Sequence, residues 1–215
     1  LPMPQKHIIP KENLFERILA VGPHPDDIEL GCFGTLAKYK AEGSKIAHFV
    51  ATCGGVGGEE QKRRDEAMES AKIIDAKVYF GELPDTAIPE AHPTIGMIEA
   101  VIKEFQPTCI IVNSPNDTHQ DHRAVAKATI SAGRFVPLIL YYQTPSSGRQ
   151  FTPNVFVDIT ETIDEKMKAV KLHKSQGENV YMADRAIRGL ADFMALQVYQ
   201  GGKYVEGFEL YQMII

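Results

Sequence analysis

Histidine and aspartate side chains gather in two short stretches of this chain, and both residue types can bind metal ions and transfer protons. The first stretch, residues 22–27, follows an apolar run and reads Gly-Pro-His-Pro-Asp-Asp. Pro23 and Pro25 fix their own φ angles and bias the residues before them towards extended geometry. His24 is therefore held stiffly from both sides, which suits a metal ligand. The alternative is a proline-rich turn whose aspartates only cap the next helix.

The second stretch, residues 114–123, reads Ser-Pro-Asn-Asp-Thr-His-Gln-Asp-His-Arg and also follows an apolar run. His119 and His122 are three residues apart near the expected start of a helix, and such residues share one helix face. A single histidine there would be an ordinary surface residue or a cap partner. Two such clusters instead favour a metal site. His24, Asp27 and His122 offer two imidazoles and one carboxylate, a ligand set that suits zinc and leaves a position open for water.

These residue types suit the hydrolysis of an amide at neutral pH. A bound zinc ion lowers the pKa of its water from about 16 to about 7. The reaction also needs a base beside that water and a donor for the developing oxyanion and the leaving nitrogen. Asp26 and Asp27 are adjacent and cannot point to the same place, so one can bind the metal while the other accepts a proton. Asp121 is either catalytic or a complement to the positive end of a helix.

Two other function classes stay open. The same metal could serve an esterase or a phosphoesterase, although phosphoryl chemistry usually uses two metals or an arginine clamp. A non-catalytic metal-binding α/β module would need a structural zinc with four protein ligands, commonly cysteines. The three cysteines, Cys32, Cys53 and Cys109, form no such motif. Iron(II) or cobalt could occupy the same ligand set as zinc.

The elements that must position these residues alternate between strand and helix patterns. Strands are expected over residues 18–21, 45–52, 78–80, 108–113, 138–142, 154–158 and 205–211, and helices over 31–42, 60–75, 94–105, 121–133, 163–174 and 183–196. This rhythm predicts a Rossmann-like three-layer α/β fold with a mainly parallel β-sheet and the metal site at the carboxyl ends of its strands. We expect residues 1–215 to form one domain, in which residues 1–16 are an irregular N-terminal segment.

Composition narrows the partners and the compartment. The net charge of −5 and the pI near 5.8 give no electrostatic footprint for nucleic acid. No apolar run reaches the roughly eighteen residues of a transmembrane helix, and residues 1–17 contain no signal-peptide core. The odd number of cysteines without a C-x-x-C pair indicates a reducing compartment and mostly buried thiols. We therefore expect a cytoplasmic protein.

One further stretch, residues 53–58, reads Cys-Gly-Gly-Val-Gly-Gly and is too rich in glycine for regular structure. It could form a backbone nest for an anion. It lacks the G-x-G-x-x-G order of a dinucleotide site. With Gly55 and Gly57 as the first two glycines, the third would have to be residue 60, which is not glycine. A mobile loop that borders a pocket is the interpretation we favour.

Five segments carry a family resemblance. They are His-Pro-Asp-Asp-Ile-Glu-Leu-Gly at 24–31, Arg-Arg-Asp-Glu at 63–66, His-Gln-Asp-His-Arg at 119–123, His-Lys-Ser-Gln at 173–176 and Tyr-Val-Glu-Gly-Phe at 204–208. In type and order these segments resemble the PIG-L/LmbE family of zinc-dependent de-N-acetylases, which remove acetyl groups from N-acetylglucosamine conjugates. Ile28, where many members have a second acid, and Gln120, where proline is frequent, depart from the pattern. These departures spare the metal site and leave the substrate open.

The resemblance implies one zinc ion per chain, held by His24, Asp27 and His122. It also implies that Asp26 is the general base and that His119 polarises the amide or protonates the leaving amine. Asp121 would orient His119 and, as a nearby opposite charge, raise its pKa. A protonated His119 would then be the form that acts as a donor.

The remaining implications concern the substrate, a small amino-sugar conjugate. Residues expected to contact it are Arg63 and His173 from the resembling segments, with Tyr142 and Arg149 beside a strand-end loop that could wall the sugar pocket. His173 ends a helix, so a structural role is an alternative for it. The oligomeric state stays open, with a homo-oligomer among the options.

Overall fold

The computed structural model describes residues 14–215, so most of the expected irregular segment, residues 1–16, lies outside the described residues. The strands are β1 (Arg17–Gly22), β2 (Lys45–Val50), β3 (Lys77–Phe80), β4 (Cys109–Asn113), β5 (Leu138–Tyr142), β6 (Val155–Asp158) and β7 (Val205–Met213). The helices are α1 (Asp27–Ala41), α2 (Glu60–Lys72), α3 (Thr94–Phe105), α4 (Gln120–Gly133), α5 (Ile163–Leu172) and α6 (Asp184–Gln197), with short 3-10 helices η2 (Lys174–Gln176) and η3 (Val180–Met182). Each expected strand and helix is present.

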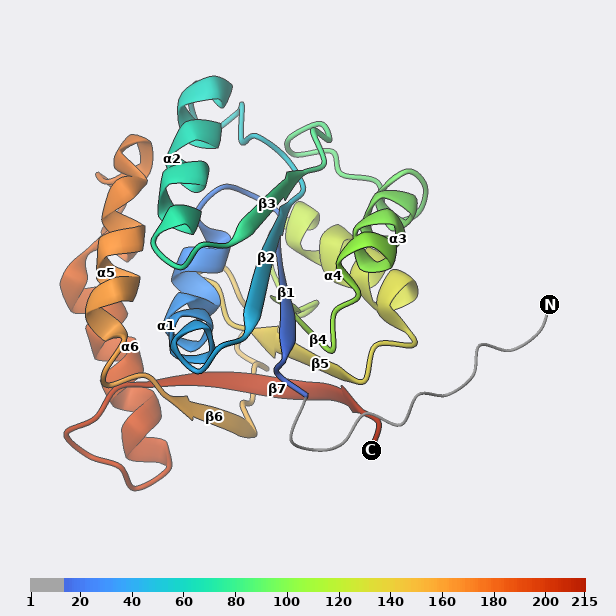
Figure 1. Ribbon diagram of the computed structural model, residues 1–215. Helices are drawn as coiled ribbons and strands as arrows, with labels where there is room; N and C mark the ends of the chain where they lie inside the picture. Colours follow the sequence, from blue (N-terminus) through green and yellow to red (C-terminus); the bar gives the residue numbers. More distant parts are fainter. Residues whose placement is uncertain (1–13) are drawn as a thin grey trace.

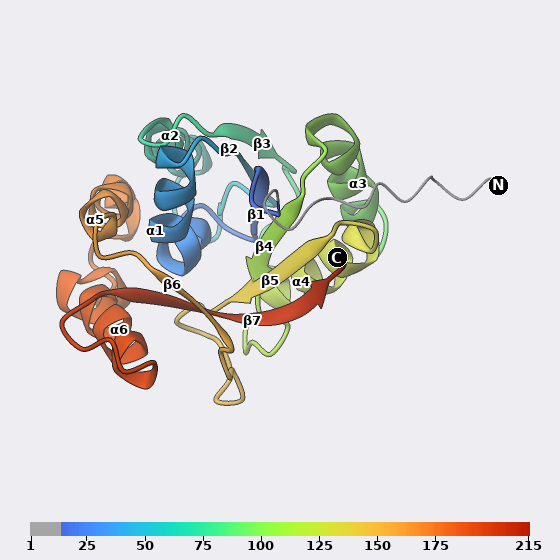
Figure 2. The ribbon, with the colours of Figure 1, turned by 60° about the horizontal axis from the view of Figure 1, so that its bottom comes forward.

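The strands form one seven-stranded sheet in the order β3-β2-β1-β4-β5-β7-β6. The strands from β3 to β5 in this order run parallel, whereas β7 runs antiparallel to β5 and β6. Helices α1, α2, α5 and α6 lie on one side of the sheet, and α3 and α4 lie on the other (Figures 1 and 2). The expected three-layer α/β fold with a mainly parallel sheet is confirmed.

Strand β1 lies at the centre of this arrangement because its side chains alternate between the two helix layers. Ile18 and Ala20 belong to the apolar cluster that includes α1 and α5 residues, and Leu19 and Val21 to the cluster that includes α3 and α4 residues. All four side chains are completely buried. The loop that carries His24 therefore leaves from a strand that is fixed on both faces.

Helix α1 begins at Asp27, earlier than the apolar spacing predicted. The N–H of Leu30 donates to the carbonyl of Asp26 over 2.9 Å, which closes a first helical turn in which acidic and apolar residues alternate. Apolar periodicity cannot locate such a turn. Asp27 consequently projects from the start of a helix, and its backbone is held by the hydrogen bonds of that helix.

The thiols follow the expectation from composition. Cys32, Cys53 and Cys109 are all free, and Cys32 and Cys109 are buried. Burial raises the pKa of both buried thiols, so they are poor nucleophiles at neutral pH. Among residues 14–215, no helix combines the length and apolar character that crossing a membrane requires.

Candidate metal centre

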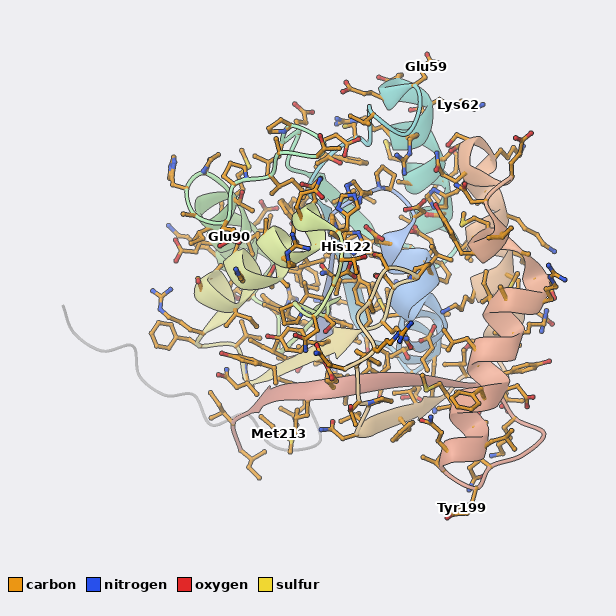
Figure 3. All side chains as sticks on the ribbon, turned by 180° about the vertical axis from the view of Figure 1, so that it is seen from behind. Glu59, Lys62, Glu90, His122, Tyr199 and Met213 are labelled. Carbon is orange, nitrogen blue, oxygen red and sulfur yellow. The ribbon has the colours of Figure 1, made fainter. Side chains whose placement is uncertain are left out.

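The two polar stretches meet because β1 and β4 are parallel neighbours in the sheet. Their carboxyl ends lie at the same edge, so the loop after β1 and the start of α4 face each other. Figure 3 shows His122 at this junction, between α4 and α1. A cavity of about 330 Å³, called here the central cavity, opens beside it and is lined by His24, Asp26, Asp27, His119 and His122 among others.

Three of these side chains converge on one point. Nδ1 of His24 lies 3.2 Å from Oδ2 of Asp27, and Nε2 of His122 lies 3.4 Å from the same oxygen. The backbone N–H of His24 also donates to this carboxylate over 2.9 Å, which fixes its orientation. The ligand atoms of His24, Asp27 and His122 are thus close enough to hold one metal ion.

The opposite nitrogen of each imidazole is held by a carboxylate. Nε2 of His24 lies 3.1 Å from Oδ2 of Asp121 and 3.2 Å from Oδ1 of Asp85. Nδ1 of His122 lies 3.1 Å from Oδ2 of Asp117. Histidines that bind metals almost always donate their other ring N–H to a carboxylate, a carbonyl or water, which fixes the tautomer and the ring orientation. The donor set and its surroundings therefore fit a transition metal.

Charge at this point favours a cation. Burial would lower the pKa of His24, but its hydrogen bonds to Asp121, Asp27 and Asp85 outweigh burial and raise the pKa to about 12. Burial would raise the pKa of Asp27, but the charges of His122 and His24 outweigh it and lower the pKa to about 2. A group of carboxylates that stabilises a protonated imidazole this strongly also stabilises a metal ion in the same place.

A second combination of ligand atoms uses the other nitrogen of His24. His24, His119 and Asp121 also lie close enough to hold an ion. Both groups contain the half-buried His24, but the second adds the half-buried His119 and the buried Asp121, whereas the first adds Asp27 and His122, which are both buried. In this second group Asp121 would be a ligand, and Asp27 would be left without a cation. The group formed by His24, Asp27 and His122 is therefore the better fit to a metal ion.

Asp26 lies beside the ligands without being one of them. Its backbone has a φ of 123°, which residues other than glycine seldom adopt and which turns the chain sharply into α1. Its side chain makes no capping hydrogen bond to the helix, so the capping alternative does not hold. Burial and the charge of Asp27 raise the pKa of Asp26 to about 7, against the opposing charges of Arg63, His173 and His24.

Arg63 stabilises the backbone turn at Asp26 through hydrogen bonds. Its Nη2 donates to the carbonyl of Pro25 over 2.9 Å and contacts Oδ2 of Asp26 at 3.5 Å, and its Nη1 donates to the carbonyl of Gly54 over 2.8 Å. The guanidinium is nearly inaccessible although it borders the central cavity. A Cβ on Gly54, which has a φ of +69°, would lie 2.2 Å from Nη1 of Arg63. The glycines of this loop therefore allow the backbone to fold around the arginine, and the loop borders the cavity as expected.

His119 is the N-cap of α4, and its Nδ1 accepts the backbone N–H of Asp121 over 3.2 Å. The carboxylate of Asp121 instead faces His24 and accepts the N–H of Thr86 over 2.7 Å. Asp121 therefore contacts His119 through its backbone N–H and not through its carboxylate, and its role in orienting His119 stays a prediction. Burial lowers the pKa of His119, as do the charges of His24 and His122, and the charge of Asp121 only partly opposes them. The pKa of His119 is thus lowered and not raised as expected, because burial and the charges of the two other histidines outweigh the charge of Asp121.

Three of the expected substrate residues lie away from the central cavity. Tyr142 is completely buried, donates its hydroxyl to the carbonyl of Val21 over 2.9 Å, and packs where a Cβ on Gly31 would clash with its ring. His173 is also buried and lies 3.4 Å from Glu29. Arg149 is exposed in the loop after β5 and does not line the cavity. None of these three side chains lines the central cavity, and their contact with a substrate stays a prediction.

Asp85, Asp117 and Thr144 take part in the site without having been singled out from the sequence. Asp85 follows β3, and its Oδ2 accepts the N–H of Val56 over 2.8 Å. Asp117 accepts from the Thr144 hydroxyl over 2.7 Å while it faces His122. Asp117 lies within the second polar stretch, so its closeness to the histidines was a usable signal. Asp85 and Thr144 stand in separate loops and carry no local signal.

Residues 19–133 match the PIG-L family, described as GlcNAc-PI de-N-acetylase. The chain is 34% identical over 177 residues to the uncharacterized deacetylase YaiS of Escherichia coli, an alignment that covers 78% of this chain and 96% of that protein. It is 28% identical over 223 residues to the diacetylchitobiose deacetylase of Thermococcus kodakarensis, covering 91% of this chain and 83% of that protein.

Solved structures share the architecture. The conserved protein TT1542 from Thermus thermophilus aligns with a TM-score of 0.80 at 25% identity, covering 92% of this chain and 95% of that one. The 4-carboxy-2-hydroxymuconate hydratase GalB from Pseudomonas putida aligns with a TM-score of 0.81 at 19% identity, covering 93% of this chain and 98% of that one. At this identity the second likeness concerns the fold alone, which thus carries more than one kind of chemistry.

Proposed function

The chain belongs to the PIG-L family of de-N-acetylases, and on this premise we propose that it removes the acetyl group from an N-acetylglucosamine-type conjugate. The observation that carries the proposal is the convergence of His24 and His122 on Oδ2 of Asp27, with a carboxylate behind each imidazole. This arrangement places a metal-binding group and a separate carboxylate, Asp26, in one cavity. Hydrolysis of an amide needs both.

The metal we propose is zinc, held by Nδ1 of His24, the carboxylate of Asp27 and Nε2 of His122. Two imidazoles and one carboxylate form a ligand set of known catalytic zinc sites. When bound, zinc lowers the pKa of a water to near neutrality and polarises a carbonyl oxygen. Asp121 contacts Nε2 of His24 and Asp117 contacts Nδ1 of His122, each over 3.1 Å, so both imidazoles are held at the nitrogen that does not face the metal position.

Asp26 is the residue we assign as general base. Its carboxylate borders the central cavity next to Asp27, and the backbone turn at Asp26 aims the two carboxylates differently. Asp26 takes the proton of the attacking water as the carbon–oxygen bond forms. It then returns that proton to the nitrogen as the carbon–nitrogen bond breaks, and acetate and the free amine leave. Arg63 keeps Asp26 in place through Pro25 and the carboxylate itself.

His119 is the residue we assign as donor to the amide oxygen. Because Nδ1 accepts the N–H of Asp121, the neutral ring carries its proton on Nε2. Burial lowers the pKa of His119, so the neutral ring is the form present at pH 7. An N–H donor that is already positioned stabilises the oxyanion without any change in protonation.

The charge of the central cavity favours a neutral sugar over an anionic substrate. Among the described residues that line it, Arg63 is the only lysine or arginine; its two Nη atoms bond to Pro25, Gly54 and Asp26, and its Nε is buried. A polycarboxylate, the kind of substrate implied by the name of the 4-oxalmesaconate hydratase of Pseudomonas putida, which is 24% identical over 189 residues, would meet further carboxylates there. Deacetylation is therefore favoured over hydration.

Acetate release tests the proposal. The purified protein is incubated with free, lipid-linked, thiol-linked and nucleotide-linked N-acetylglucosamine, with and without a chelator, and acetate is measured enzymatically. We expect release from at least one conjugate, loss of release with the chelator, and recovery with added zinc. Hydration of an unsaturated polycarboxylate without any release of acetate would overturn the proposal.

A further inference from the structure

A second cavity, of about 230 Å³, lies next to the central cavity. We call it the α6 cavity because Ala186, Ile187, Leu190, Ala191 and Met194 of that helix line it. Leu30, Pro145 and Tyr181 line both cavities, so the two share a wall. Resting on the proposed function, we propose that the α6 cavity binds an apolar chain attached to the amino-sugar substrate.

The first support is the chemistry of the lining. The contribution of α6 is entirely alanine, isoleucine, leucine and methionine, and Val205 and Gly207 add further apolar surface from β7. Leu190, at 44% exposure, is a large apolar side chain that a bound chain would cover. Apolar side chains around a concave site gain free energy when an alkyl group replaces water.

The second support is that the charged groups of the lining are already paired. Lys166 bonds to Oε1 of Glu206 over 2.5 Å and donates to the carbonyl of Leu30 over 2.7 Å. The N–H groups of Gly34 and Thr35 donate to Glu206 over 3.1 and 2.7 Å. Both side chains are buried and have partners for their charges. The α6 cavity therefore offers no free charge to attract an ionic ligand.

The chain can be attached to the substrate in two ways. It can be an alkyl aglycone on the sugar, or it can be an acyl group longer than acetyl on the nitrogen. Only Leu30, Pro145 and Tyr181 stand between the two cavities, so either kind of chain has to pass only these side chains to reach the α6 cavity from the metal centre. Both are apolar chains that the α6 cavity would bind in the same way. Substrates that carry the chain at one position or the other identify which of the two it is.

The test compares kcat/KM for methyl and hexyl glycosides of N-acetylglucosamine, and for methyl glycosides of N-acetyl and N-hexanoyl glucosamine. Each methylene group that becomes fully buried raises affinity by roughly fourfold. We expect one of the two hexyl-length substrates to exceed its short counterpart by about tenfold or more. Equal values for short and long chains in both pairs, with the methyl glycoside still turned over, would overturn the proposal.

Ala186→Phe should block the α6 cavity, which Ala186 lines. Ala186 is exposed, so the larger side chain does not disturb the packing of the core. We expect it to remove most of the chain preference while kcat/KM for the methyl N-acetyl glycoside stays within about twofold. Leu196→Phe is the matched control, because Leu196 is an exposed α6 residue outside the cavity lining. A preference that survives Ala186→Phe intact would place the chain elsewhere.

A binding measurement separates this proposal from the proposed function. Calorimetry with hexyl and methyl glucosaminide needs no turnover, and burial of the chain gives tighter binding with a more negative heat-capacity change. Absence of acetate release from every substrate, with tighter hexyl binding that Ala186→Phe removes, would reject the deacetylase and keep the apolar site. Equal binding of the two glucosaminides would reject an alkyl aglycone as the occupant, and equal kcat/KM for the N-acetyl and N-hexanoyl substrates in addition would reject the apolar site.

Discussion

The backbone N–H of Asp121 donates a hydrogen bond to Nδ1 of His119 over 3.2 Å. This contact leaves Nε2 as the position of the proton on the neutral imidazole, and it gives His119 the role of helix cap at the same time. A residue that is held by its own helix in this way is a rigid donor. The carboxylate of Asp121 is left free to hold His24.

His119→Ala should retain the metal and lower kcat by roughly 10²–10³-fold, the usual effect of removing one oxyanion donor. Because the neutral ring is the active form, the basic side of the pH–rate profile should not depend on His119. Metal content by mass spectrometry and pH profiles of both proteins check this. Loss of the metal from His119→Ala would show that the group formed by His24, His119 and Asp121 is the true ligand set.

Alanine in place of His24, Asp27 or His122 should abolish metal retention, because two remaining ligands hold an ion too weakly. Metal analysis after dialysis should give near-stoichiometric zinc for the wild type and little for the three variants. The same analysis distinguishes zinc from iron or cobalt. Full metal occupancy in any one variant would remove that residue from the ligand set.

Asp26→Asn should keep the metal and lower turnover by roughly 10²–10⁴-fold, which is what general base catalysis contributes. The amide side chain has nearly the same shape, and the turn at Asp26 depends on its backbone. Rates from acetate release and metal content are measured on the same preparation. An unchanged rate would assign the base to another carboxylate.

Arg63→Gln should reduce both stability and turnover with the metal retained, because the carbonyls of Pro25 and Gly54 lose a buried charged donor. We expect a loss of about 2–4 kcal/mol in the free energy of unfolding and a fall in kcat without a matching rise in KM. Arg64→Gln is the control, since Arg64 pairs with Glu82 at the surface. A rise in KM with unchanged kcat would instead support the sugar contact that the resemblance implies for Arg63.

His48 should make the protein sensitive to mild acid independently of the metal. It is buried in β2, and its Nε2 has no hydrogen-bond partner among residues 14–215. Burial lowers the pKa of His48 from 6.5 to about 4; the charge of His173 lowers it further, and the charge of Glu29 opposes both. Below pH 6.5 the unfolded chain takes up a proton that the folded chain refuses, so stability falls until about pH 4. The contribution is roughly 3 kcal/mol over this window.

His48→Leu should lose that part of the acid sensitivity, because leucine binds no proton in either state. Denaturant unfolding at several pH values between 7 and 4 measures the difference, on metal-free protein for both chains. Parallel pH dependence of the two proteins would show that His48 titrates normally in the folded state.

The sequence alone determined the order of strands and helices, the parallel centre of the sheet, and two polar stretches at strand ends. These are local properties, because apolar periodicity and proline or glycine punctuation lie within short windows. The grouping of His24, Asp27 and His122 followed from the same logic, since the carboxyl ends of parallel strands share an edge. That these three residues bind the metal stays a prediction, which the metal analysis of the alanine variants tests.

Only the tertiary structure decided which groups face each other. Asp85 reaches His24 from the loop after β3, and Asp121 turns its carboxylate to His24 and not to His119, because loop packing sets such pairings and leaves no mark on residue spacing. Burial also depends on packing, and it placed Tyr142 in the core although its position at a strand end suggested the pocket. The α6 cavity has the same origin, since it forms where α6, β7 and the first turn of α1 meet.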